Sequence, residues 1–146
     1  MIERIVHDGL ELALILRADT PVDGIRFHTE SEASLQVGQM LRPKGYMIRP
    51  HVHVPVPRTV SYTQEVLFIK SGRVQVDFYD EQQQYLESRE LSPGDVVLLA
   101  RGGHGFCMIE PSEIVEVKQG PYVGENDKIR FDGIADNEKS RGISEK

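Results

Sequence analysis

The sequence is poor in the residues that mark several large protein classes. Its 146 residues contain one cysteine and no tryptophan, and aromatic residues make up only 7%. Because Cys107 is alone, no internal disulfide can form and the fold does not depend on an oxidising compartment. Basic residues number 17 against 23 acidic ones, so the formal net charge is -6. A chain of this composition lacks the basic surface and the stacking platforms of nucleic-acid-binding proteins, so we expect no nucleic-acid partner.

Long apolar runs are also missing. The best is Leu10–Leu16, which Glu11 interrupts and which is far shorter than the roughly 18 residues of a membrane helix. The first residues lack the basic region and apolar core of a secretion signal. We therefore expect a cytoplasmic protein with no membrane partner. The length predicts one domain over residues 1–135, followed by a polar tail over 136–146.

Short segments with alternating or β-branched residues fill the chain, and no amphipathic stretch of helical period is visible. Turn signals recur between these segments, so the pattern of about ten short strands predicts an all-β sandwich or barrel. The expected strands are Ile2–Val6, Leu10–Arg17, Ser34–Arg42, Glu65–Lys70, Arg73–Tyr79, Tyr85–Leu91, Val96–Ala100, His104–Ile109 and Glu113–Lys118.

The histidines are not scattered. His51 and His53 are two residues apart, so on a strand both imidazoles would project from one face. Imidazole is the commonest protein ligand of first-row metals. Glu65 shares its parity with Leu67 and Ile69, and if those two face the core the carboxylate needs a partner or a metal.

His104 follows a glycine-rich turn and shares its parity with Phe106 and Met108, which predicts an inward side chain. Two alternatives stay open at this point. Glu65 could be a surface residue at the start of a strand, and His104 could be a loop residue exposed by its neighbouring glycines.

Two runs of residues resemble the motifs of the cupin superfamily. Gly45-x5-His51-x-His53, continued by Glu65-x6-Gly72, is similar to the first motif, and Gly94-Asp95-x4-Ala100-x-Gly102-x-His104 is similar to the second. The resemblance covers roughly residues 33–120. It implies a double-stranded β-helix, the cupin jelly-roll barrel of antiparallel strands. It also implies a divalent metal held by His51, His53, Glu65 and His104.

The chain departs from the family pattern in three places. Eleven residues, Val54–Gln64, separate His53 from Glu65, where the family has only a few. Ala100 stands where proline is usual, and Met108 stands where asparagine is frequent. Because this inserted stretch contains Pro55 and Pro57, it is expected to be a loop. It could form a lid or substrate wall beside the metal, or be a plain surface excursion.

Three functions are compatible with these residues. The first is a metal-dependent enzyme (an isomerase, decarboxylase or dioxygenase) acting on a small organic molecule, with Fe, Mn, Ni, Zn, Co or Cu as the metal. The second resembles metal-free nucleotide-sugar epimerases and ketoisomerases, with a histidine and Tyr62 as the acid–base pair. The third is a non-catalytic cupin that binds a small ligand.

Further candidate residues follow from parity and position. Arg49 would share the face of His51 and could clamp a substrate carboxylate or phosphate, or it could be an exposed strand end. Tyr62 and Gln119 could bind a ligand, and Cys107 has no base beside it that would make it a nucleophile. The apolar N-terminal strands and the family resemblance predict a homodimer.

Overall fold

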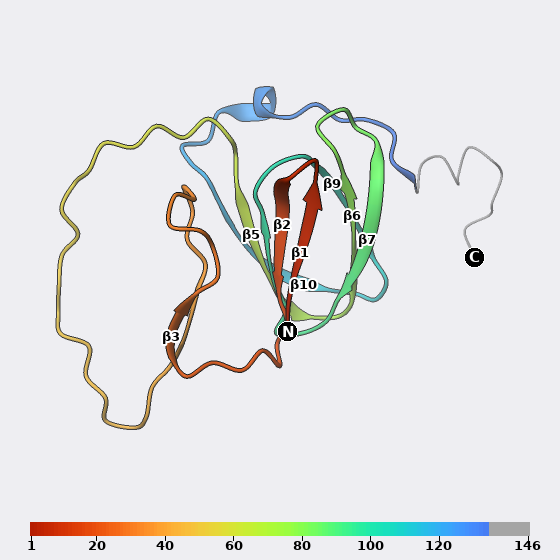
Figure 1. Cartoon of the computed structure of the whole chain (residues 1–146). Coiled ribbons are helices and arrows are strands. Elements are labelled where there is room, and N and C mark those ends of the chain that lie inside the picture. Colours follow the sequence, from red (N-terminus) through yellow and green to blue (C-terminus); the bar gives the residue numbers. More distant parts are fainter. Residues whose placement is uncertain (135–146) are drawn as a thin grey trace.

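The computed structural model describes residues 1–134, which form ten β-strands and one short 3-10 helix (Figure 1). The elements are β1 (Ile2–His7), β2 (Leu10–Leu16), β3 (Gly24–Phe27), β4 (Gly38–Leu41), β5 (Glu65–Ser71), β6 (Val74–Tyr79), β7 (Tyr85–Leu91), β8 (Val96–Leu99), β9 (Gly103–Met108), β10 (Glu113–Lys118) and η1 (Gly124–Asp127). All strand pairs are antiparallel, which confirms the all-β expectation.

The strands are arranged in two larger sheets and one hairpin. The five-stranded sheet has the order β1-β2-β8-β5-β10, and the three-stranded sheet has the order β7-β6-β9. The hairpin of β3 and β4 is a separate two-stranded sheet. In Figure 1 it stands to one side of the two larger sheets.

The main core lies between the two larger sheets. Leu67 and Ile69 of β5 pack in one cluster with Val76 and Phe78 of β6, and all four are at most 5% exposed. Residues two apart on a strand share a face, so each sheet turns an apolar face towards the other. Burying each such side chain contributes about 1.5–3 kcal/mol before entropy is counted.

A second, smaller cluster covers the opposite face of the five-stranded sheet. Val37 packs there against Leu14 of β2 and Leu98 of β8, with Leu35 beside it. The segment that leads into β4 is therefore held on the face that looks away from the main core. Because residues 35 and 37 pack against this face, the strand expected over Ser34–Arg42 is shorter and covers only Gly38–Leu41.

Most of the other expected strands are confirmed to within two residues. The strand at Gly24–Phe27 was missed because its alternation, Ile25 and Phe27 around Arg26, spans only four residues. The prediction of a loop over 54–64 is confirmed. Residues 42–64 contain no strand, so the condition under which His51 and His53 would project together from a strand is not met in this chain. Pro50 adds to Pro55 and Pro57 in removing backbone donors from this stretch.

The tail expected at 136–146 lies outside the described residues. Within residues 1–134, no helix has the length and apolar character needed to cross a membrane.

A buried carboxylate fixes the turn between β7 and β8. Asp95 accepts hydrogen bonds from the backbone N–H groups of Ala18 and Ser92, at 2.8 and 2.9 Å, and from the Arg17 guanidinium at 2.9 Å. Gly94 has a φ of 90°, and a Cβ there would lie 2.8 Å from the Ala18 side chain. The sequence Gly94-Asp95 therefore ties this turn to the chain that follows β2.

Replacing Asp95 by alanine is expected to destabilise the fold by about 3 kcal/mol, because two backbone donors and the Arg17 guanidinium lose a buried acceptor. Denaturant unfolding followed by circular dichroism measures this change. Asp19→Ala is the matched control, since the Asp19 side chain is 88% exposed, and its effect should stay within about 0.5 kcal/mol. Equal effects of the two substitutions would contradict the role given to Asp95.

Glu3 on β1 joins the same network through Arg17, which follows β2, and through Arg89 on β7, and it should make stability pH-dependent. Its pKa lies below the ordinary value because Arg17 donates a hydrogen bond to it, and the Arg89 guanidinium contributes as well. A lowered folded-state pKa stabilises the fold above the unfolded-state pKa, and this contribution is lost as pH falls through the folded-state value. Glu3→Gln should therefore lower the free energy of unfolding at pH 7, with a gap to wild type that closes below about pH 4. Chemical unfolding from pH 7 to pH 3 measures this gap, and a constant gap would contradict the prediction.

Candidate functional site

The site is built around a carboxylate that strand alternation places in the interior. Glu65 begins β5 and is 8% exposed, on the same face as the buried Leu67 and Ile69. The inward orientation predicted from parity is therefore confirmed. An ionised carboxylate in such a position is costly unless charge or hydrogen bonds compensate for its burial.

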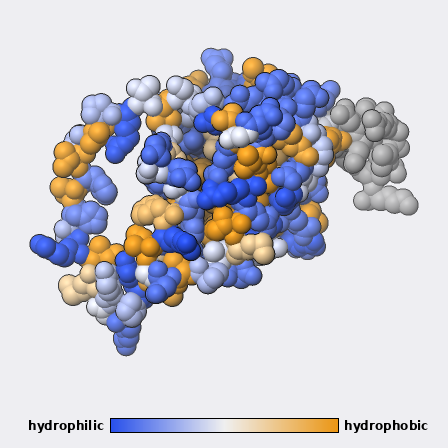
Figure 2. Space-filling view, in the orientation of Figure 1, coloured by the Kyte–Doolittle hydropathy of each residue, from blue (hydrophilic) through white to orange (hydrophobic). Residues whose placement is uncertain are grey.

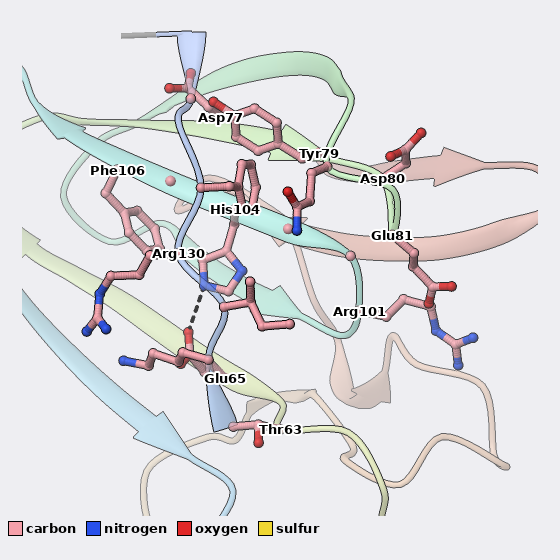
Figure 3. A pocket seen from close by; sticks show the side chains of 18 of the residues that line it. Thr63, Glu65, Asp77, Tyr79, Asp80, Glu81, Arg101, His104, Phe106 and Arg130 are labelled. Atoms are coloured by element: carbon pink, nitrogen blue, oxygen red, sulfur yellow. Dashed lines mark ion pairs between the residues drawn. The ribbon is translucent and has the colours of Figure 1, made fainter. Parts of the chain in front are cut away.

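His104 supplies that compensation from the opposite sheet. It stands on β9 directly opposite the buried Phe78 of β6, so both side chains share the inner face. Its Nε2 lies 3.1 Å from the Oε2 of Glu65, the contact drawn as a dashed line in Figure 3. The Phe106 ring, also on β9, lies 5.4 Å from the His104 ring between centroids. We call Glu65 and His104 the dyad.

The charge of Glu65 is favoured by its surroundings. Its pKa lies below the ordinary value chiefly because His104 donates a hydrogen bond to the carboxylate, while burial acts in the opposite direction. Glu116 and Lys118 on the neighbouring β10 also lower this pKa. Lys118 lies directly opposite Glu65 in the register of β5 and β10. The carboxylate is therefore held ionised, which is the form that binds a metal or accepts a proton.

The dyad opens into a cavity of about 1100 Å³. Residues of β5, β6 and β9 form part of its wall, and the chain after η1 forms another part (Figure 3). Phe131 of that later segment packs on Tyr79 with ring centroids 5.1 Å apart. A Cβ on Gly103 would lie 2.9 Å from the Phe131 ring, so glycine at this position lets the segment cross the three-stranded sheet.

The cavity is also lined by basic residues that the sequence did not suggest. Arg101 lies in the turn before β9, and its guanidinium is 4.9 Å from the centre of the Tyr62 ring. Arg101, Tyr62 and Arg130 all line the cavity. Tyr62 is therefore one of the expected ligand-binding residues that lies at the dyad's cavity. Arg101 could have been suspected from its place three residues before His104, but parity arguments do not extend through a glycine turn.

His51 and His53 lie elsewhere in this chain. Both are exposed in the extended segment 42–64, which we call the arm, and their rings are 5.4 Å apart. The Nδ1 of His51 donates a hydrogen bond to the Arg49 carbonyl at 2.9 Å, so in the neutral ring the lone pair is on Nε2. The two imidazoles are neighbours, as their spacing predicts, but they are not brought to the dyad.

Among residues 1–134, no group of three or more histidine, cysteine, aspartate or glutamate side chains is arranged to hold a metal ion. The four expected ligands are thus divided into two pairs, His51 with His53 on the arm and Glu65 with His104 in the cavity. Each pair alone provides two ligands, fewer than the three or four protein ligands of typical transition-metal sites.

Two of the remaining candidates, Arg49 and Gln119, lie outside the cavity wall. Arg49 is exposed on the arm, and Gln119 is exposed after β10, where its backbone N–H donates to the Gln64 carbonyl at 2.9 Å. Cys107 is an exposed free thiol on β9 and borders the cavity. It lies opposite Gln75 in the register, on the other face of the strand from His104.

No protein-family model, curated protein or solved structure was found to match the chain. The cupin resemblance therefore depends on the residues of the two motifs alone.

The dyad should be visible as an energetic coupling. We expect His104→Ala and Glu65→Ala each to destabilise the fold, and the double variant to lose about 1–2 kcal/mol less than the sum of the two, because the pair is largely shielded from water. Chemical unfolding of the four proteins gives this coupling energy. The control is a second cycle on the exposed pair Lys70 and Glu113, for which we expect less than about 0.5 kcal/mol. If the losses of unfolding free energy in the two single variants simply add up in the double variant, the contact between Glu65 and His104 is contradicted.

Proposed function

We propose that this protein is a metal-dependent enzyme of the cupin type that acts on a small organic molecule. The observation that carries the proposal is the convergence of the Glu65 carboxylate and the His104 imidazole, 3.1 Å apart, inside a cavity of about 1100 Å³. A cavity of this size can hold a small molecule together with a metal. The two antiparallel sheets are compatible with a jelly-roll barrel, which forms part of the proposal.

The donor atoms of the dyad suit a divalent transition metal. One carboxylate oxygen and one imidazole nitrogen lie 3.1 Å apart, and both atom types bind Fe, Mn, Co, Ni, Zn and Cu ions. His51 and His53 would complete a set of three imidazoles and one carboxylate. Such a metal supplies a Lewis acid that polarises a substrate oxygen or activates water, which fits isomerase, decarboxylase or dioxygenase chemistry.

One basic side chain at the cavity, Arg101, is placed to bind an anionic group of the substrate, beside acidic residues that also line the cavity. Arg101 is held against the Tyr62 ring and has no ion pair with any of the described residues, so its guanidinium can pair with a carboxylate or phosphate. In this proposal Arg101 takes the anion-binding role that sequence reasoning gave to Arg49, and Tyr62 positions it.

One observation favours a second candidate, a metal-free acid–base enzyme. A carboxylate hydrogen-bonded to an imidazole orients the ring and fixes its tautomer, as in enzymes that use a histidine for general acid–base catalysis. Tyr62 and Arg101 would then bind or protonate the substrate. The two candidates differ in one measurable property, the requirement for metal.

The metal content of the purified protein distinguishes the metal-dependent enzyme from the metal-free acid–base enzyme. We expect the purified protein to bind about one Zn²⁺ or Co²⁺ per chain at micromolar concentration, measured by inductively coupled plasma mass spectrometry after dialysis. Glu65→Gln and His104→Ala should each weaken binding at least tenfold, because each removes a ligand. Glu113→Gln is the matched control, since Glu113 is an exposed carboxylate that pairs with Lys70 and does not line the cavity, and it should leave metal binding unchanged.

Wild-type protein that binds no divalent metal would overturn the metal-dependent proposal. Tight binding that survives both dyad substitutions would overturn it as well, because the metal would then occupy another place. Turnover of a substrate that persists after a chelator has removed the metal would favour the acid–base enzyme.

A further inference from the structure

Most of the arm stands apart from the rest of the described chain, and only its last residues, such as Tyr62 against Arg101, contact the two larger sheets or their turns. For residues 43–61, the hydrogen bonds and ring contacts found within the described part of the chain join residues of the arm to one another or to its first residue, Arg42. Figure 1 shows the arm as a wide loop beyond β3, standing away from the two larger sheets. Its two ends are nevertheless fixed, by β4 on one side and by a 3.0 Å hydrogen bond from Ser34 to Gln64 on the other.

The arm is unusually apolar for a segment in water. Met47 is 84% exposed, Val52 is 89% exposed and Val54 is 76% exposed. Figure 2 shows such apolar residues along the loop, with open space between the loop and the body of the molecule. Contiguous exposed apolar residues of this kind mark a surface that is covered by another protein segment.

The two larger sheets, which we call the body, have unpaired strand edges beside the dyad in the described part of the chain. β9 ends the three-stranded sheet and β10 ends the five-stranded sheet, so within residues 1–134 each has one unpaired edge. Phe106 of β9 faces the interior, directly opposite the fully buried Val76, yet it is 37% exposed. Met108 faces the same interior and is 48% exposed. The sandwich is therefore open on the side where the dyad lies.

The arm has the pattern of the strand that this opening lacks. In an extended chain, His51 and His53 project from one face while Val52 and Val54 project from the other. A strand added along β9 would turn one of these faces to the interior. With the histidines inward, their imidazoles approach Glu65 and His104, and the ligand pairs that are separate in one chain meet in one site.

We propose that two copies of this chain exchange their arms, so that His51 and His53 of one copy complete the Glu65 and His104 site of the other. The inference rests on the proposed metal site, and it adds that a single chain does not contain a complete one. The metal would bind at the interface between an arm and a body that belong to different copies.

The anchoring of the arm favours exchange over closure onto its own body. Val37 and Leu35 hold the segment before β4 on the face of the five-stranded sheet that looks away from the dyad. From there the arm projects outwards and returns only at Gln64, next to β5. A two-fold exchange covers both apolar arms and pairs both open β9 edges in one association step. Domain swapping of this kind forms between two copies the same contacts that an arm closed onto its own chain would form.

A complementation experiment tests the exchange. One variant carries His51→Ala and His53→Ala, and the other carries Glu65→Gln and His104→Ala. Alone, each should bind Co²⁺ at least tenfold more weakly than wild type. Unfolded together in equal amounts and refolded, they should recover about a quarter of the wild-type Co²⁺ content, because half of the random dimers contain one intact site. A mixture that recovers nothing, when wild type binds Co²⁺, would overturn the exchange and favour closure within one chain.

A second measurement does not depend on metal. We expect wild type to have twice the chain mass by light scattering, and a variant with residues 46–60 replaced by an equal number of Gly and Ser residues to be monomeric. Val6→Ser, on the far edge strand β1, is the matched control and should stay dimeric. A monomeric wild type, or a dimer that survives replacement of the arm, would overturn the exchange. A dimer that needs the arm but binds no Co²⁺ would support the exchange and remove the metal site.

Discussion

The burial of one carboxylate constrains the whole site. Glu65 lies on the same side of β5 as Leu67 and Ile69, so the alternation that builds the core also carries a negative charge into it. Such a charge is tolerated only with a partner, and His104 reaches it from the opposite sheet. The contact between β5 and β9 therefore brings the two sheets together at the point where the sandwich is otherwise open.

The molecule differs in character between this open side and the turn between β7 and β8. Around Asp95, buried hydrogen bonds and the guanidinium of Arg17 join segments that are distant in the sequence. Within residues 1–134, two sheet edges around the dyad are unpaired, and interior side chains such as Phe106 and Met108 are partly exposed. A rigid framework on one side and an incomplete wall on the other is the arrangement expected where a ligand or a second chain enters.

Much of the fold was predictable because it follows from period-two alternation. The strands from β5 to β10 were found in this way, and so was the inward orientation of Glu65. The loop over 54–64 was predictable as well, because Pro55 and Pro57 withhold backbone donors. The separation of His51 and His53 from the dyad was not, since their spacing shows only that they are neighbours. Arg101 and Phe131 were missed because turns and irregular chain carry no periodicity. Motif spacing predicts which side chains share a face, whereas tertiary contact decides which faces meet.

The position of the single thiol has a practical consequence. Cys107 lies on the same edge strand as His104 but on its other face, it is exposed, and it is the only cysteine in the chain. One spin label or fluorophore attached there would sit at the rim of the cavity with its linker directed away from the dyad. The wild-type sequence thus carries its own unique attachment point, from which the approach of a ligand, a metal or another chain along β9 can be followed spectroscopically.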